Sequence, residues 1–277
     1  MSNTLVSIGI PTYNRPDDLE DLLASLLDQT HQNLEIIVSD NKSEDIRVQQ
    51  IIKQYAEQDK RFVPIFQKEN IGMEANFNAV FEKASSEYFM WLSDDDRIAS
   101  NYIESCLGFL SSNEDYVLAC GMTKYKGEDG LGEKMYSYES NKIETRILDY
   151  ISTAGKNSVF YGLFRREVLR NNPIEDYLGF DWNIMTSLLC FGKFKILDET
   201  FLLRSLDGVS ANRKNLRRKY AIHGFRRPFF ELILAKNVSK NLAKFCRNAV
   251  SEDVNWSSTR LKVFIKICQK LIRKFLT

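Results

Sequence analysis

Three consecutive carboxylates, Asp94, Asp95 and Asp96, directly follow the apolar run at residues 88–92. Two like unit charges about 4 Å apart repel by about 4 kcal/mol at an effective dielectric constant of about 20. A divalent cation removes this repulsion, and carboxylate oxygens are ligands that Mg²⁺ and Mn²⁺ prefer. One or two of the carboxylates would hold the metal, and the remaining one would bind a hydroxyl group. The alternative is an acidic turn that caps the following helix.

Polar residues also follow three earlier apolar runs. These polar segments are residues 11–15, 39–41 and 70–72. Tyr13 offers a flat face to a nucleotide base, and Asp40 can accept a hydrogen bond from a base N–H group. Asn70 and Gly72 permit a ligand to approach the backbone closely before a helix begins. Each residue also has an ordinary explanation, which is packing for Tyr13 and turn formation for Asp40.

The elements that must position these residues alternate two periodicities. Short β-branched or apolar runs occupy residues 5–10, 34–38, 63–66 and 88–92, and helical patterns occupy residues 17–29, 46–58 and 74–84. This alternation predicts a parallel, doubly wound α/β sheet with right-handed crossovers. Ligands of such sheets bind beyond the carboxyl ends of the strands, so we expect the four polar segments at one edge.

Charge is divided unevenly along the chain. Residues 1–203 hold 20 lysines and arginines against 33 acidic residues, whereas residues 204–277 hold 18 against 4. Such a tail suits an anionic partner, which is lipid, nucleic acid or the acidic front half itself; a solvated helical face is the plain alternative. Residues 261–276 predict an amphipathic helix that either lies on a membrane or docks on the core and exposes its lysines.

The chain begins without the basic flank and cleavage site of a signal peptide, and no window approaches eighteen uncharged apolar residues. We therefore expect a cytoplasmic protein, with peripheral contact to the inner face of the cell membrane if the tail binds lipid.

Three segments resemble the GT-A fold glycosyltransferases of family 2, and together they cover about the first 105 residues. The segments are VSIGIPTYNRPDDLEDLLASLLDQT, EIIVSDNKSED and NIGMEANFNAVFEKASSEYFMWLSDDDRI. The resemblance implies an inverting enzyme with a single Rossmann-like, mostly parallel sheet flanked by helices. It also implies a nucleotide-diphosphate sugar as donor and Mn²⁺ or Mg²⁺ as cofactor.

The resemblance implies roles for individual residues. Asp40 would bind the base, Asp95 would lie at the ribose or diphosphate, and Asp96, with Asp95, would hold the metal. Asp94 would bind the donor sugar or brace the loop. The expected nucleotide-binding residues are Pro11, Thr12, Tyr13, Asn14, Asp40, Asn70, Gly72, Asp94 and Asp95.

Asp181 is the expected catalytic base because Phe180-Asp181-Trp182 resembles the acidic pair of the family, although Phe180 replaces the first acid. Capping of the helix at residues 182–191 is the alternative role for Asp181. Further on, Leu206 stands where the family often has a histidine. Either Arg204 or Asp207 would substitute, or the metal would rely on Asp96, phosphate and water.

We expect residues 1–105 to form the nucleotide-sugar-binding half of one GT-A domain, residues 106–205 its acceptor-binding half, and residues 206–277 a basic helical extension. The expected function is metal-dependent, inverting sugar transfer to a glycan or lipid-linked glycan in bacterial surface polysaccharide synthesis. Membrane contact would involve residues 257–277, and no nucleic acid is expected as a partner. The alternative is a non-catalytic protein that binds nucleotide sugars or nucleic acid through the basic tail.

Overall fold

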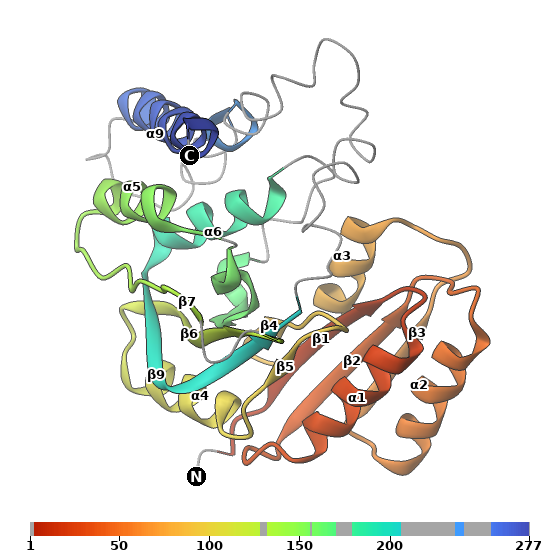
Figure 1. Ribbon diagram of the computed structural model, residues 1–277. Helices are drawn as coiled ribbons and strands as arrows, with labels where there is room; N and C mark the ends of the chain where they lie inside the picture. The colour runs from red at the N-terminus through yellow and green to blue at the C-terminus, as the bar shows by residue number, and fades with distance from the viewer. Residues whose placement is uncertain are drawn as a thin grey trace, which may run out of the picture.

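The structure, a computed structural model, describes residues 3–127, 132–155, 157–169, 179–205, 236–240 and 256–276. Within these residues, one nine-stranded sheet runs in the order β3-β2-β1-β4-β8-β6-β9-β5, with β7 paired to β6. Helices cover both faces of this sheet (Figure 1). The α/β fold expected from the sequence is confirmed.

The amino-terminal half alternates strands and helices as the sequence predicts. The strands β1, β2 and β4 bury both faces and therefore read as continuous apolar runs, whereas the edge strand β3 is partly exposed. All four pair in parallel. The elements are β1 (Val6–Thr12), α1 (Pro16–Leu27), β2 (Leu34–Asp40), α2 (Ile46–Gln58), β3 (Phe62–Phe66), α3 (Met73–Lys83) and β4 (Tyr88–Trp91).

The strand order reverses at β1. Strands β2 and β3 lie on one side of β1, and β4 lies on the other. Right-handed crossovers therefore place α1 and α2 on one face of the sheet and α3 on the opposite face (Figure 1). Ligands of doubly wound sheets bind at such a reversal, beyond the carboxyl ends of the strands. In this protein, that position lies between the ends of β1 and β4.

The second half extends the same sheet with mixed strands. Strand β8 is antiparallel to both β4 and β6, whereas β9 runs parallel to β6 and ends beside β5. The elements are β5 (Arg97–Ile98), α4 (Tyr102–Ser112), β6 (Tyr116–Tyr125), β7 (Gly132–Glu133), α5 (Ile143–Thr153), η1 (Ser158–Tyr161), β8 (Leu163–Arg165), η2 (Arg166–Leu169), α6 (Phe180–Phe191) and β9 (Lys193–Arg204).

An irregularity in β9 explains why this half gives a weak sequence pattern. Gly121 of β6 pairs with Leu197 and the next residue, Met122, pairs with Phe201, so residues 198–200 of β9 have no partner in β6 and interrupt the alternation of side chains along β9. A side chain at Gly121 would lie 2.7 Å from the backbone of Thr200. Glycine is therefore required opposite these extra residues.

Helix α9 (Trp256–Leu276) packs against α5. Val263 and Ile267 are buried, and Lys262 Nζ lies 2.7 Å from Glu144 Oε1 on α5. The predicted helix is thus present, and its first half docks on the domain. The side chains from Cys268 onward lie outside the described residues, as do residues 206–235 and 241–255 of the expected extension. No helix within the described residues is long and apolar enough to cross a membrane.

Arg146 on α5 satisfies the carbonyl groups at the end of α6. Its Nε and Nη2 atoms donate to the carbonyl oxygen of Leu189 at 3.0 and 2.8 Å, and its Nη1 donates to Ser140 at 2.7 Å. The side chain is 6% exposed, and burial lowers its pKa. Buried carbonyl groups without partners are costly, so this residue ties α6 to α5.

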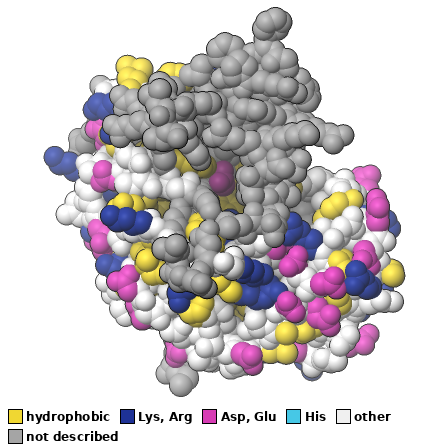
Figure 2. All heavy atoms as spheres, in the orientation of Figure 1, with side chains coloured by type: hydrophobic (Ala, Val, Ile, Leu, Met, Phe, Trp, Pro, Cys, Tyr) yellow, Lys and Arg dark blue, Asp and Glu magenta, His cyan; other side chains and the backbone are white. Residues whose placement is uncertain are grey.

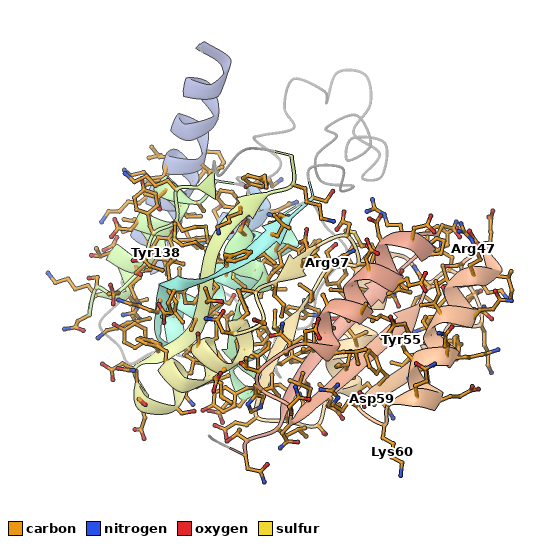
Figure 3. All side chains as sticks on the ribbon, turned by 60° about the horizontal axis from the view of Figure 1, so that its bottom comes forward. Arg47, Tyr55, Asp59, Lys60, Arg97 and Tyr138 are labelled. Carbon is orange, nitrogen blue, oxygen red and sulfur yellow. The ribbon has the colours of Figure 1, made fainter. Side chains whose placement is uncertain are left out.

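Replacing Arg146 with methionine should lower the free energy of unfolding by about 2 to 4 kcal/mol, because it leaves these carbonyl groups unsatisfied. Urea denaturation would measure the change. Arg47→Met is the matched control, since Arg47 lies exposed on α2 and its ion pairs among the described residues are to Asp17 and Asp45 (Figure 3). Equal midpoints for the two variants would contradict the role of Arg146.

Candidate active site

Asp94 and Asp95 both face the end of β1. The Thr12 hydroxyl donates to Asp94 Oδ2 at 2.8 Å, and Arg15 Nη1 donates to Asp95 Oδ2 at 2.6 Å. Asp95 Oδ1 also accepts a hydrogen bond from Ser93 at 2.6 Å. The exposed fractions of Asp94 and Asp95 are only 7% and 4%. Asp94 and Asp95, which follow β4, therefore connect to the end of β1 through Thr12 and Arg15, at the point where the strand order reverses.

Asp96 interacts with the end of β9 instead. Its Oδ1 accepts the backbone N–H of Ser205 at 2.9 Å, and its Oδ2 lies 3.6 Å from Arg204 Nε. Arg204 also donates from Nη1 to Ser158 Oγ at 3.0 Å, and its guanidinium lies over the ring of Tyr161. The three consecutive carboxylates thus join the carboxyl ends of β1, β4 and β9.

Burial dominates the electrostatics of this acidic platform, which we define as Asp94, Asp95 and Asp96. Loss of solvent raises the pKa of Asp94 to about 7, against the hydrogen bond from Thr12. It raises the pKa of Asp96 to about 6, against the positive charge of Arg204. On the face drawn in Figure 2, acidic and basic side chains are interspersed over the half that carries α1 and α2.

Basic side chains from three strand ends accompany the platform. Arg15 follows β1, Arg204 ends β9, and Lys126, which follows β6, donates from Nζ to the carbonyl oxygen of Asp95 at 2.7 Å. From the sequence, we expected a divalent cation to relieve the repulsion between these carboxylates. In the structure, side chains far away in the sequence provide part of that relief.

The platform nevertheless retains an oxygen suited to a cation. Asp96 Oδ2 is buried and accepts no hydrogen bond from the described residues. Within those residues, no three His, Cys, Asp or Glu side chains converge on one metal position. One or two carboxylates fit a Mg²⁺- or Mn²⁺-type ion that completes its shell with phosphate oxygens and water. Leu206 and Asp207 lie outside the described residues.

Asp40 ends β2 and is fully buried. Its Oδ1 accepts the backbone N–H of Ser43 at 2.9 Å, and its Oδ2 accepts a hydrogen bond from Gln49 Nε2 at 3.2 Å. Asp40 therefore does form a turn, but each carboxylate oxygen can accept a second hydrogen bond. Tyr13 lies 39% exposed beyond β1, so its ring is accessible to a ligand. Pro11, by contrast, is buried inside β1.

Asn70 and Gly72 form a turn that is held by Asn41. The Asn41 side chain donates to Asn70 Oδ1 at 3.0 Å and accepts the N–H of Ile71 at 2.9 Å. Gly72 directly precedes the first residue of α3. It adopts φ = 86°, a left-handed conformation that favours glycine. Asn14, at φ = 55°, accepts the N–H of Glu44 at 2.7 Å and so connects the loops after β1 and β2.

Asp181 is the second residue of α6, whose cap position is Gly179 rather than the aspartate. Its carboxylate accepts backbone N–H groups of the first turn and a hydrogen bond of 2.8 Å from Asn157 Nδ2. Burial raises the pKa of Asp181, and these hydrogen bonds and the charge of Arg204 oppose the rise. Asn157 carries no motif signal in the sequence, because the turn that positions it is not periodic.

An aromatic cluster connects Asp181 to the acidic platform. Phe180 packs against Phe77 and Phe160 with ring centroids 6.4 and 6.1 Å apart. Trp91, at the end of β4, stacks on Phe160 at 5.0 Å and donates its indole N–H to the carbonyl oxygen of Phe77. This packing gives a physical reason for Phe180, which replaces the first acid of the acidic pair that the sequence resembles.

Comparison with known proteins finds a relative that acts in glycan assembly. The chain is 27% identical over 188 residues to a GalNAc(5)-diNAcBac-PP-undecaprenol beta-1,3-glucosyltransferase from Campylobacter jejuni; the match covers 66% of this chain and 59% of that protein. Matches to other curated glycosyltransferases, at 35 to 36% identity, span only 36 to 45% of their length.

Two solved structures share the fold. TarS from S. aureus, in complex with UDP-GlcNAc, matches with a TM-score of 0.60 and 17% identity over 96% of this chain and 81% of that one. The mannosyltransferase PcManGT from Pyrobaculum calidifontis, in complex with GDP-Man and Mn²⁺, matches with a TM-score of 0.57 and 12% identity over 96% and 86%. The GT-A fold expected from the sequence is thereby confirmed.

The model of the family described as Glycosyl transferase family 2 matches residues 7–172, which include the acidic platform and the ends of β1 and β2. This range covers more than half of the chain. The protein therefore belongs to glycosyl transferase family 2.

Proposed function

We propose that this glycosyltransferase moves a sugar, with inversion and with the help of a divalent metal, from a nucleotide-diphosphate sugar to a glycan or lipid-linked glycan. The observation that carries the proposal is the position of Arg204, whose Nε lies 3.6 Å from Asp96 Oδ2 and whose positive charge also opposes the rise in the pKa of Asp181. One guanidinium thus acts electrostatically on carboxylates suited to the donor and on the carboxylate suited to the acceptor.

Asp181 is the proposed general base. Its carboxylate takes the proton of the acceptor hydroxyl while that oxygen attacks the anomeric carbon, and the bond from this carbon to the diphosphate oxygen breaks. A base is most effective when its pKa approaches the working pH, and burial moves the pKa of Asp181 in that direction. As a whole residue, Asp181 is half-buried rather than enclosed.

The leaving nucleoside diphosphate needs positive charge. Arg204 and Lys126 supply two cationic groups at the platform. Asp96, and with it Asp95, are the proposed metal ligands, and the bound ion would neutralise the departing diphosphate as a Lewis acid. Support comes from Asp96 Oδ2, which accepts no hydrogen bond from the described residues, and from the Mn²⁺ in the structure of PcManGT.

The nucleotide is proposed to lie across the ends of β1, β2 and β4. Tyr13 would stack on the base and Asp40 would accept its N–H group, while the turn at Asn70 and Gly72 would lie below the donor. The roles of Pro11, Thr12 and Asn14 are indirect in this proposal: Pro11 is buried, Thr12 holds Asp94, and Asn14 joins two loops. The complex of TarS with UDP-GlcNAc supports this class of donor.

A lipid-linked acceptor would place the protein at the inner face of a bacterial membrane, in surface polysaccharide synthesis. The name of the Campylobacter relative, which includes an undecaprenol-linked glycan, supports this class of acceptor. Helix α9 buries Val263 and Ile267 but exposes Leu261 and Ile265, at 60% and 42%. Exposed apolar side chains beside lysines suit contact with anionic lipid, so α9 can dock and bind a membrane at once.

A thermal-shift screen against UDP-, dTDP- and GDP-sugars tests the donor site. We expect one nucleotide class to raise the unfolding temperature by about 3 °C or more, and only with Mn²⁺ or Mg²⁺ present, because ligands stabilise the state that binds them. Asp96→Asn should lose the metal-dependent part, while the exposed Asp28→Asn should retain it. Equal stabilisation of Asp96→Asn and wild type would remove Asp96 from the metal site.

Asp181→Asn should lower kcat for sugar transfer about 100-fold or more, because the amide cannot accept the hydroxyl proton. Transfer of radiolabelled sugar, using the donor found in the screen, would measure this change. The affinity for the donor should stay within about three-fold, since the base acts on the acceptor. Asp198→Asn, an exposed aspartate on β9, is the control. Substantial turnover by Asp181→Asn would sink the proposed base.

Membrane contact can be tested with the double variant Leu261→Ser and Ile265→Ser. Its binding to phosphatidylglycerol vesicles in a co-sedimentation assay should fall several-fold, because both side chains leave water in the membrane-bound state. Leu27→Ser is the matched control, since Leu27 is 41% exposed on α1. If the double variant and wild type sediment equally with the vesicles, α9 is a docked helix only.

A further inference from the structure

Asn157 links α5 to the carboxylate at the start of α6. The Tyr150 hydroxyl on α5 donates to Asn157 Oδ1 at 2.6 Å, and Asn157 Nδ2 donates to Asp181 Oδ2 at 2.8 Å. An ionised carboxylate only accepts hydrogen bonds, so the nitrogen of the Asn157 amide must face Asp181 and the oxygen must face Tyr150. The direction of both hydrogen bonds is therefore set by the charge on Asp181.

The backbone at Asn157 is built to present this amide. The residue adopts φ = 56° and ψ = 39°, a left-handed conformation that few residues other than asparagine, aspartate and glycine adopt readily. Asn157 is 5% exposed, and Tyr150 is fully buried. The amide is thus held between two elements, away from solvent, and its side chain makes no capping hydrogen bond to the 3₁₀ helix that it precedes.

We propose that Asn157, oriented by Tyr150, is the positioning residue that aims the carboxylate of Asp181 at the acceptor hydroxyl. This inference rests on the proposed role of Asp181 as the base. The hydrogen bond occupies one carboxylate oxygen and limits rotation of the side chain, which leaves the remaining lone pairs for the hydroxyl proton. Asn157 and Tyr150 lie outside the segments that carried the family resemblance.

The surroundings of Asp181 define what the loss of this hydrogen bond should do. Charged or titratable groups that act on Asp181 come from β9, with Arg204, and from η1, with Tyr161. Burial raises the pKa of Asp181, and the Asn157 hydrogen bond is the leading influence in the opposite direction. A donor that favours the ionised form lowers the pKa of a carboxyl, so its removal should raise the pKa further.

The test is a titration of Asp181 by NMR on protein with ¹³C-labelled aspartate carboxyl groups. The Asp181 resonance is assigned by its loss in Asp181→Asn. In Asn157→Gly, we expect the titration midpoint of Asp181 to move to higher pH; glycine adopts the left-handed conformation without strain, so the backbone is preserved. In Tyr150→Phe, the amide stays but loses its orienting partner, and we expect a smaller move in the same direction.

Tyr138→Phe is the matched control. Tyr138 (Figure 3) packs edge-on against Tyr150 and shares a hydrogen bond with Thr153, whereas the side-chain hydrogen bonds of Asn157 run to Tyr150 and Asp181. Its loss should lower stability without moving the titration of Asp181. Thermal unfolding of each variant separates loss of fold from loss of positioning.

An unchanged midpoint in both Asn157→Gly and Tyr150→Phe would overturn the inference, because a purely structural turn residue would leave the titration where it is. A midpoint that moves equally in all three variants, Tyr138→Phe included, would also overturn it. Failure of the proposed function looks different: Asp181→Asn would then keep its transfer activity, whatever the titration shows.

Discussion

Burial of three adjacent carboxylates is the constraint on which the rest of the structure depends. Charged groups removed from water are costly unless they are paired and hydrogen-bonded. One strand end cannot provide enough partners, so the carboxylates take theirs from the end of β1, from the loop after it and from the end of β9. The loop after β6 contributes Lys126, which donates to the backbone carbonyl of Asp95. The sheet order brings these loops to the end of β4, and the acidic platform in turn ties the two halves of the sheet together.

Aromatic packing next to the platform also ties separate elements of the fold together. Trp91 belongs to β4, Phe160 to η1 and Phe180 to α6, and their rings pack in direct succession. The indole N–H of Trp91 is bonded to α3, so the cluster has contacts on four elements. Because ring stacking has preferred geometries, the cluster sets where α6 begins relative to β4. The distance between Asp181 and the acidic platform is thus determined by apolar contacts.

The extent to which the sequence predicts this arrangement follows from the range of the interactions. The strands and helices before residue 92 are periodic, so their order and the meeting of their polar ends are predictable. The partners of the carboxylates are not predictable. Arg15 and Asp95, for example, are 80 positions apart, and no pattern around either residue indicates that the two side chains meet. Asn157 cannot be predicted for the same reason, and the extra residues 198–200 interrupt the pattern of β9. The strands beyond residue 105 can be recognised in the sequence only when their pairing is known.

The charges around the platform also bear on why an ion would be needed. Among the described residues, Arg15 pairs with the Asp95 carboxylate, Arg204 Nε lies 3.6 Å from Asp96 Oδ2, and Lys126 donates to the backbone carbonyl of Asp95. A nucleotide diphosphate would add at least two negative charges to this site. The side chains that already interact with the platform can offset only part of that charge. We infer that the remaining positive charge has to arrive with the donor, and a divalent ion bound by phosphate oxygens, with Asp96 as the proposed protein ligand, would supply it.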